Sequence, residues 1–254
     1  MPNPEKFEPR FKPEIQEESA GEKEKSEIEV IEQSSLSFQD KEDLLLVYLK
    51  EKPASWIGAG VRFYKTETKE KKEEKLKRLN QKGKETERAL ENLSLPNHIY
   101  KFETEEEKTV LASYDFLVGQ DLEKLNRLKE ALKSGATKEI GLALGYPESA
   151  VEGFIKGEVF DREKDLKRLP KKEKAELKKD EVFKFLTFGL SKDNWRKELE
   201  LVRKYQKVIR EKSPKIYNEV IKNARDPFTF RGRLKTSLEK ILNKIEYYKR
   251  SFKK

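Results

Sequence analysis

Charged side chains outnumber hydrophobic ones in this chain, and this imbalance limits how much of it can enter a core. Asp, Glu, Lys and Arg make up 41% of the 254 residues and hydrophobic residues 35%, whereas an average globular protein has roughly 45–50% apolar and about 25% charged residues. A chain of this length can still bury a sizeable core. We therefore expect each element to concentrate its apolar residues on one side, and long solvated surfaces or tails to carry the charge.

The residue inventory excludes several kinds of site. The chain has no Cys and a single His, so it cannot form disulfides, thiolate zinc sites or iron–sulfur clusters. Any Ser-His-Asp triad would have to be built on His98. We predict neither a metal nor a cofactor.

Nothing in the sequence predicts a membrane protein. The longest apolar run, residues 44–49, is far shorter than the roughly 20 residues of a membrane-spanning helix. The first residues have neither a basic segment nor an apolar segment of a secretion signal. We expect a soluble, cytoplasmic protein with no membrane partner.

Positive charge is concentrated in the last third of the chain. The net charge is +9, and residues 162–254 hold 30 Lys and Arg against 14 Asp and Glu. Residues 1–32 are acidic, with ten Glu against five Lys and Arg. Residues 1–35 also contain four prolines and no apolar period, a composition that cannot offset chain entropy. We predict that residues 1–35 form a disordered tail.

The apolar periodicity predicts an α+β, mostly helical fold. Apolar and polar residues alternate in residues 109–118, which predicts a strand paired with residues 98–102. Residues 56–64 read as a further, irregular strand, and the periods after residue 121 are helical. We predict a small antiparallel sheet within residues 56–118 that is packed by helices and followed by a helical basic region.

The chain divides into two folded regions after the tail. Residues 36–160 are predicted to form the α+β domain, with a helix-turn-helix-like hairpin at residues 137–155. Residues 161–254 are predicted to form the basic helical region. Near its end, apolar residues within 234–252 follow a heptad-like spacing, which we interpret as intramolecular packing, with a partner helix from another chain as the alternative.

Small and apolar residues fall where a helix-turn-helix-like hairpin needs them. Gly141 is small where the second helix would cross the first, and Gly145 suits the left-handed conformation that ends the first helix. Pro147 suits the first position of the second helix. Val151 and Phe154 are expected to pack back onto the first helix.

The second helix of the hairpin does not have the charge of a DNA-reading helix. Its exposed positions include Glu148, Ser149 and Glu152, with Lys156 as the basic residue. Two carboxylates would repel phosphates, whereas a recognition helix presents hydrogen-bond donors to base edges. We therefore expect the hairpin to serve packing rather than base recognition.

The hairpin also contains the sequence Leu-Gly-Tyr-Pro-x-x-x-Val, formed by Leu144, Gly145, Tyr146, Pro147 and Val151. This pattern resembles a signature of uncharacterised prokaryotic proteins that are classed as a domain of unknown function. In some of those proteins cysteines follow the Gly-Tyr-Pro, where this chain has Ser and Ala. The resemblance implies a shared family fold and no known activity.

Two segments of the basic third are candidate contacts for nucleic acid. One is a predicted helix on which four basic residues share a face, namely Arg196, Arg203, Lys207 and Arg210. The other is a predicted loop in which aromatic and basic residues interleave, namely Arg225, Phe228, Phe230, Arg231 and Arg233. Such a loop could stack bases and hold phosphates. In the alternative interpretation, the two Phe anchor the loop and the Arg are solvated or pair with acids.

These observations favour a non-catalytic binding protein that associates with nucleic acid through its basic third. The alternative is a scaffold or protein-interaction module with an acidic partner, which could be its own N-terminal tail. A second alternative is an enzyme that uses carboxylates or Tyr146, although no carboxylate pair stands out in the sequence. One continuous basic face would favour nucleic acid, and interspersed acids would favour the scaffold. Lysine-rich segments such as residues 164–179 are typical of solvated surfaces.

Overall fold

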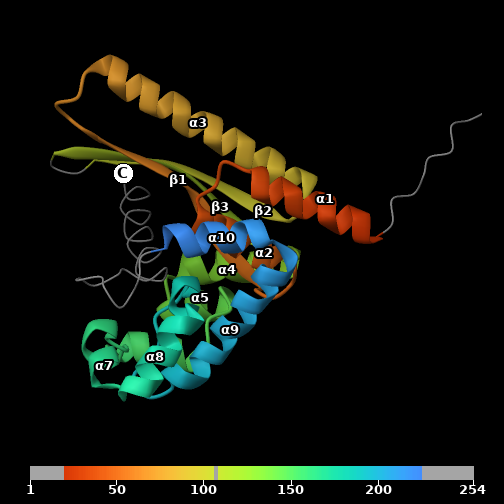
Figure 1. Ribbon diagram of the computed structural model, residues 1–254. Coiled ribbons are helices and arrows are strands. Elements are labelled where there is room, and N and C mark those ends of the chain that lie inside the picture. The colour runs from red at the N-terminus through yellow and green to blue at the C-terminus, as the bar shows by residue number, and fades with distance from the viewer. Residues whose placement is uncertain (1–19, 106–107, 225–254) are drawn as a thin grey trace, which may run out of the picture.

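The computed structural model describes residues 20–105 and 108–224, and it shows an α+β, mostly helical fold (Figure 1). The predicted fold class is confirmed. The strands are β1 (Ala54–Tyr64), β2 (Asn97–Glu105) and β3 (Thr109–Gly119). The helices before residue 160 are α1 (Ala20–Gln33), α2 (Phe38–Tyr48), α3 (Lys69–Asn92), α4 (Leu122–Ser134), α5 (Thr137–Ala143) and α6 (Glu148–Lys156). The later ones are α7 (Arg162–Arg168), α8 (Lys171–Asp180), the 3-10 helix η1 (Val182–Phe185), α9 (Trp195–Lys212) and α10 (Pro214–Asn223).

The sheet is antiparallel, with β3 between β1 and β2. Ala54 pairs with Gly119 and Tyr64 with Thr109, so β1 and β3 run side by side over their whole length. Because β3 is central, nearly all its residues are buried. The long helix α3 packs along β1 and β3, and α2 and α4 contact the same two strands (Figure 1).

The N-terminal segment departs from the predicted tail. Residues 20–33 form α1, and Ile28 and Ile31 are 6% and 0% exposed in the core. The prediction of disorder is therefore wrong for this part, while residues 1–19 lie outside the described residues. Two isoleucines three residues apart share one helix face. The high charge of the segment hides this narrow apolar stripe in the sequence. The stripe is sufficient to hold α1 in place because Ile28 and Ile31 pack into the core that the rest of the protein forms.

Acidic side chains of α1 reach other helices. Glu24 accepts a bond from Lys212 Nζ at 2.7 Å, and Glu32 accepts one from Ser213 Oγ at 2.5 Å. Glu27 accepts a bond from Tyr48 Oη at 2.6 Å, and burial together with this contact raises the pKa of that phenol. The acidic segment is thereby joined to α2 and to the junction of α9 and α10.

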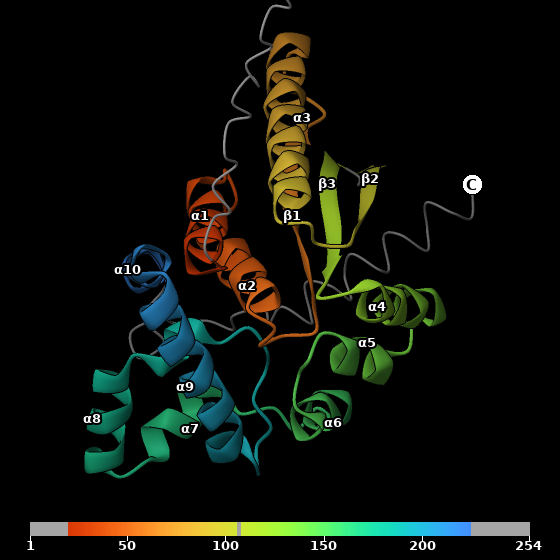
Figure 2. The same ribbon diagram turned by 90° about the vertical axis from the view of Figure 1, so that its right-hand side faces the viewer.

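Helices α7 to α10 form the described part of the basic region. Helix α9 buries a face that packs against α2, η1 and α10. In Figure 2, α7, α8 and α9 lie on one side of the lower part of the molecule and α4, α5 and α6 on the other. The predicted heptad-like segment, residues 234–252, lies outside the described residues.

Candidate nucleic-acid interface

Two ion pairs with the same spacing join α8 to α9. Arg196 Nε donates to Glu173 Oε1 at 2.9 Å, and Arg203 Nε donates to Asp180 Oδ2 at 2.7 Å. In each helix the partners are seven residues apart, which is close to two helical turns. Gln206 Nε2 also donates to the Asp180 carbonyl at 2.6 Å. Two of the predicted nucleic-acid contacts therefore hold α8 against α9.

The four basic residues predicted to share a face on α9 have different surroundings. The Arg196 guanidinium also lies 4.3 Å from the centre of the Trp195 ring. Lys207 Nζ is 4.0 Å from Glu211 Oε1. Arg210 is exposed and has no ion pair among the described residues. Acids are thus interspersed along this face, and a nucleic-acid role for these four residues stays a prediction.

The side of α8 that faces away from α9 carries two pairs of lysines. Exposed lysines at both ends of the helix have no acidic partner within the described part of the chain: Lys171, Lys172, Lys178 and Lys179. We call these four residues the α8 lysine face. Glu176 is exposed at its edge, whereas Glu173 and Asp180 point to α9. Two of the three acids of α8, Glu173 and Asp180, therefore face α9, while the four exposed lysines face outward.

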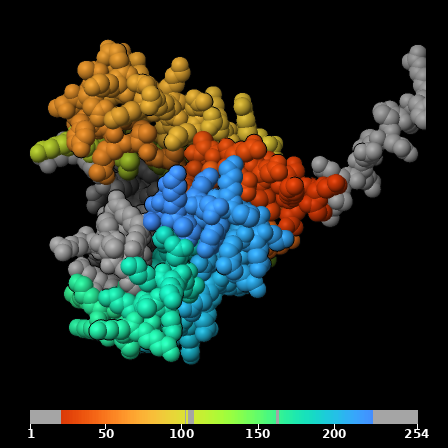
Figure 3. Space-filling model, viewed as in Figure 1, coloured from red at the N-terminus to blue at the C-terminus, as the bar shows by residue number. Residues whose placement is uncertain are grey.

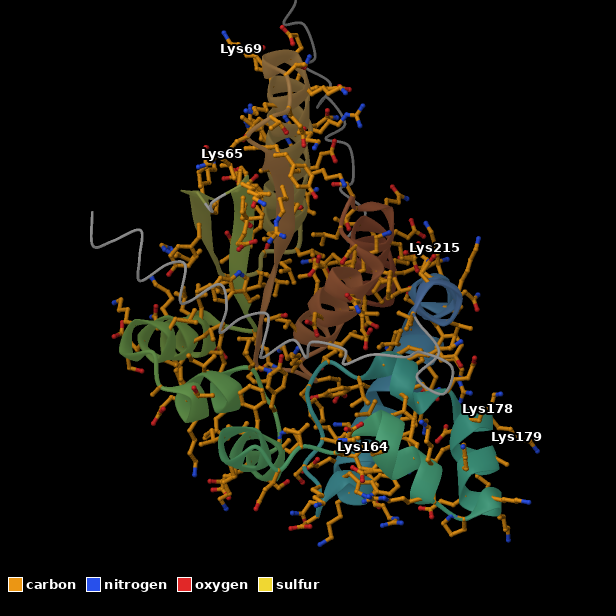
Figure 4. The ribbon with its side chains drawn as sticks, turned by 90° about the vertical axis from the view of Figure 1, so that its left-hand side faces the viewer. Lys65, Lys69, Lys164, Lys178, Lys179 and Lys215 are labelled. Atoms are coloured by element: carbon orange, nitrogen blue, oxygen red, sulfur yellow. The ribbon has the colours of Figure 1, made fainter. Side chains whose placement is uncertain are left out.

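The α8 lysine face lies at the end of the molecule opposite α3. The space-filling view shows α8 on the outer surface there (Figure 3). Lys178 and Lys179 project away from the protein, and Lys164 of α7 lies in the same part of the molecule (Figure 4). Lys65 and Lys69 lie at the opposite end (Figure 4). Positive charge within the described residues is thus spread over separate surfaces (Figure 4).

Burial fixes the orientation of α8. Leu177 is 5% exposed and belongs to the core. The two Arg–carboxylate pairs are partly exposed, so each contributes at most about 1 kcal/mol to stability. Their main effect is to set which side of α8 faces α9. Leu177 and the two ion pairs therefore fix the rotation of α8 about its axis, so that its exposed lysines extend away from α9.

The sequence contained a signal for this surface. Lys171 and Lys172 recur as Lys178 and Lys179 after one heptad, and Glu173 recurs as Asp180 with the same spacing. A lysine-rich segment such as residues 164–179 is typical of a solvated surface, and its sequence does not show which side its acids face. Contact with α9 assigns Glu173 and Asp180 to the inner side of α8.

The residues of the predicted aromatic and basic loop, namely Arg225, Phe228, Phe230, Arg231 and Arg233, all lie outside the described residues. Their proposed stacking and phosphate contacts stay predictions.

The helix-turn-helix-like hairpin has the predicted close crossing. A Cβ at Gly141 would lie 2.6 Å from Val151 Cγ2, so only glycine allows the two helices this near. Gly145 has φ +78°, and the amides of Gly145 and Tyr146 donate to the carbonyls of Leu142 and Gly141 at 3.0 Å each. This pair of bonds is the Schellman arrangement of a helix end.

The second helix of the hairpin begins one residue later than predicted. Pro147 is the N-cap of α6 rather than its first residue, because its extended ψ precedes the helix while its carbonyl accepts the Val151 amide. Val151 is buried and Phe154 is half-buried against the core. Both therefore pack as expected.

The polar residues of α6 make contacts within the protein. Lys138 of α5 lies 2.7 Å from Glu148 and 3.0 Å from Glu152, and these contacts raise the pKa of the lysine and lower that of Glu152. Ser149 Oγ donates to Glu198 of α9 at 2.7 Å. These side chains join α6 to its neighbours, which agrees with a packing role.

Tyr146, the candidate for an enzymatic role, is buried. It is 5% exposed, and its ring centre lies 5.5 Å from that of Phe188. Lys52 Nζ lies 5.4 Å from the ring centre of Tyr146. The side chain thus packs against Phe188 and lies close to Lys52, two residues before β1.

Comparisons with protein-family models, with curated proteins and with solved structures found no match to this chain. The resemblance to a domain of unknown function therefore stays a prediction. Within residues 20–105 and 108–224, no helix is both long and apolar enough to cross a membrane.

Proposed function

We propose that the protein binds nucleic acid through the α8 lysine face. The observation that carries this proposal is the separation of charge on α8, because Arg196 and Arg203 neutralise two of its three acids, Glu173 and Asp180, which would otherwise repel phosphates. Neutralising phosphates with lysines releases condensed counterions, which favours binding at low salt. The proposal moves the contact from α9, where the basic residues were expected to act, to α8.

The chemistry of this face fits a polyanion better than an apolar partner surface. Protein interfaces depend on buried aromatic or apolar anchors, and surface-bound membrane helices insert an apolar side into the headgroup region. The apolar residue of α8 that could do either, Leu177, is buried in the core. What remains outside is a set of lysine ammonium groups on long, flexible stems.

One observation favours the alternative of an acidic protein partner. Acidic residues of α1 contact the α9–α10 junction through the Glu24–Lys212 ion pair and the bond from Ser213 to Glu32. These contacts lie within one chain, so α1 itself supplies the acidic partner at that position. The α8 lysine face has no such partner among the described residues.

The test compares two variants that remove equal charge. The first replaces all four residues of the α8 lysine face by Gln, and the second replaces four exposed lysines of α3 by Gln: Lys71, Lys77, Lys82 and Lys84. Gln keeps helix propensity. Binding of the full chain to labelled oligonucleotides is measured by fluorescence anisotropy between about 50 and 200 mM salt.

We expect the unmodified protein and the α3 variant to bind, and the α8 variant to lose most of its affinity and its salt dependence. Circular dichroism verifies that both variants are folded. Absence of binding by the unmodified protein at about 50 mM salt, where counterion release favours association strongly, would overturn the proposal. Equal losses in the two variants would also overturn it, because net charge alone would then explain binding.

A further inference from the structure

The α8 lysine face lacks the side chains that read or stack bases. Ala175 lies between the two lysine pairs and Glu176 lies at the edge, and no aromatic residue is present in α8. Binding to single strands relies on aromatic platforms for stacking. Direct reading of base edges in a groove uses Arg or Lys on guanine and Asn or Gln on adenine, and the planar Arg fork is better suited to such bidentate contacts than the flexible point charge of Lys. Helix α8 has no aromatic, Arg, Asn or Gln side chain, and its lysine point charges suit phosphates better than base edges.

The spacing of the lysines suits a duplex backbone. The two pairs are separated by seven residues, which corresponds to about 10 Å along a helix axis. The major groove of B-form DNA is about 12 Å wide, so the two pairs could contact phosphates on either side of a groove. Ala175, the small residue between them, leaves room for a close approach of the helix.

From this arrangement we infer that α8 binds the phosphate backbone of double-stranded DNA without reading its sequence. The inference rests on the proposed function and adds the form of the nucleic acid and the mode of contact. Four lysine–phosphate contacts predict a slope of about −3.6 for log affinity against log salt on a duplex. Between 50 and 200 mM salt, this slope corresponds to a loss of affinity of about a hundredfold.

The experiment uses the full chain with three DNA probes of equal length. Two are duplexes of different base composition, and the third is one strand of the first duplex. We expect equal affinity for the two duplexes and at least tenfold weaker binding of the single strand. The Gln variant of the α8 lysine face should lose the duplex preference, whereas the α3 variant described above should keep it.

The outcomes separate this inference from the proposed function. Tighter binding of the single strand, or a clear preference between the duplexes, would overturn the inference if that binding is still lost in the α8 variant, and would leave the proposed function standing. Failure of the unmodified protein to bind any probe would overturn both. Binding to vesicles with anionic lipid, combined with no binding to DNA, would also overturn both and identify a membrane surface as the partner.

Discussion

Gly145 shows how one backbone conformation and one neighbouring ring determine a residue type. Its φ is +78°, and a Cβ built there would lie 2.4 Å from Pro53 Cδ. Gly157 has a similar φ of +74°, but a Cβ there would meet nothing within 4 Å. A comparison of substitutions at the two glycines therefore distinguishes the cost of backbone strain from the cost of steric contact.

We predict that Gly157→Ala lowers the free energy of unfolding by about 1 kcal/mol, because left-handed backbone is unfavourable for alanine. Gly145→Ala should lower it by at least about 1 kcal/mol more, since the rigid Pro53 ring must move. Urea unfolding of the two variants measures the difference. Equal losses would show that the contact with Pro53 is absent in solution.

A buried group of charges lies where α2 meets β1. Glu42 is 2% exposed, and its Oε1 has no hydrogen-bond partner among the described residues. Burial raises the pKa of Glu42 well above its ordinary value, and the neighbouring Asp43 raises it further, while Lys52 opposes this. Lys52 is 1% exposed and lies 2.6 Å from Asp43 Oδ1, and Ser55 Oγ donates to Asp43 Oδ2 at 3.1 Å.

The raised pKa of Glu42 predicts how stability depends on pH. The folded protein favours the protonated form of the Glu42 carboxyl. The stability that this form gives is fully present below the pKa of Glu42 in the unfolded chain. It is lost as the pH rises through the raised pKa of Glu42 in the folded protein. We expect Glu42→Gln to increase the free energy of unfolding near neutral pH. The gain should shrink as the pH falls toward 4.5, the ordinary pKa of a glutamate, which urea unfolding across this range measures.

Asp43→Asn provides the control of opposite sign. It removes the charged partner of the buried Lys52 ammonium, which should destabilise the protein by about 3 kcal/mol or more at neutral pH. Equal destabilisation by both variants at neutral pH would contradict the prediction for Glu42. It would mean that the Glu42 carboxylate makes contacts as favourable as those of the Asp43 carboxylate.

At the scale of elements, α1 is joined to the fold by few residues. Ile31 is fully buried, whereas Glu29 on the other side is exposed. We predict that Ile31→Ala lowers the free energy of unfolding by about 2–4 kcal/mol. Glu29→Ala should change it by less than about 0.5 kcal/mol. Equal small effects in urea unfolding would mean that α1 does not contribute to the core in solution.

Helices α8 and α9 show a different use of charge between elements. Arg196 and Arg203 were expected to face a ligand, and they face the acids of α8 instead. Partly exposed ion pairs stabilise weakly, yet they decide which side of a helix with little apolar surface turns outward. The outward lysines follow from that choice.

At the scale of the whole molecule, the hairpin and the α8 lysine face are separate. In Figure 2, α7 and α9 lie between α6 and α8. Glu148 and Glu152 are held by Lys138 rather than by a residue near α8. Charges separated by more than the Debye length, about 8 Å at physiological salt, are largely screened from each other.

We therefore predict that the double substitution Glu148→Gln and Glu152→Gln leaves DNA affinity within about twofold of the unmodified protein at about 150 mM salt. Fluorescence anisotropy measures this, with the Gln variant of the α8 lysine face as the comparison. A gain of tenfold or more would place α6 next to the bound DNA and argue for a reading role of the hairpin.

Local features of this protein were predictable from the sequence because they depend on neighbours along the chain. The alternation in residues 109–118 predicted β3, and the order of Gly141, Gly145 and Val151 predicted a crossing and a turn that the structure confirms. Turn conformation and strand alternation are set by a few adjacent residues. These features could therefore be predicted from the sequence before the packing of the core was known.

Two other features were decided by the tertiary structure. Helix α1 is ordered because the core offers a site for Ile28 and Ile31, which the charge-rich composition of the segment concealed. The α8 lysine face exists because Arg196 and Arg203, 23 residues further along the chain, meet Glu173 and Asp180. Which side of a helix faces inward depends on the element that packs against it. The partners of the charged residues of α8 could therefore be assigned only from the fold.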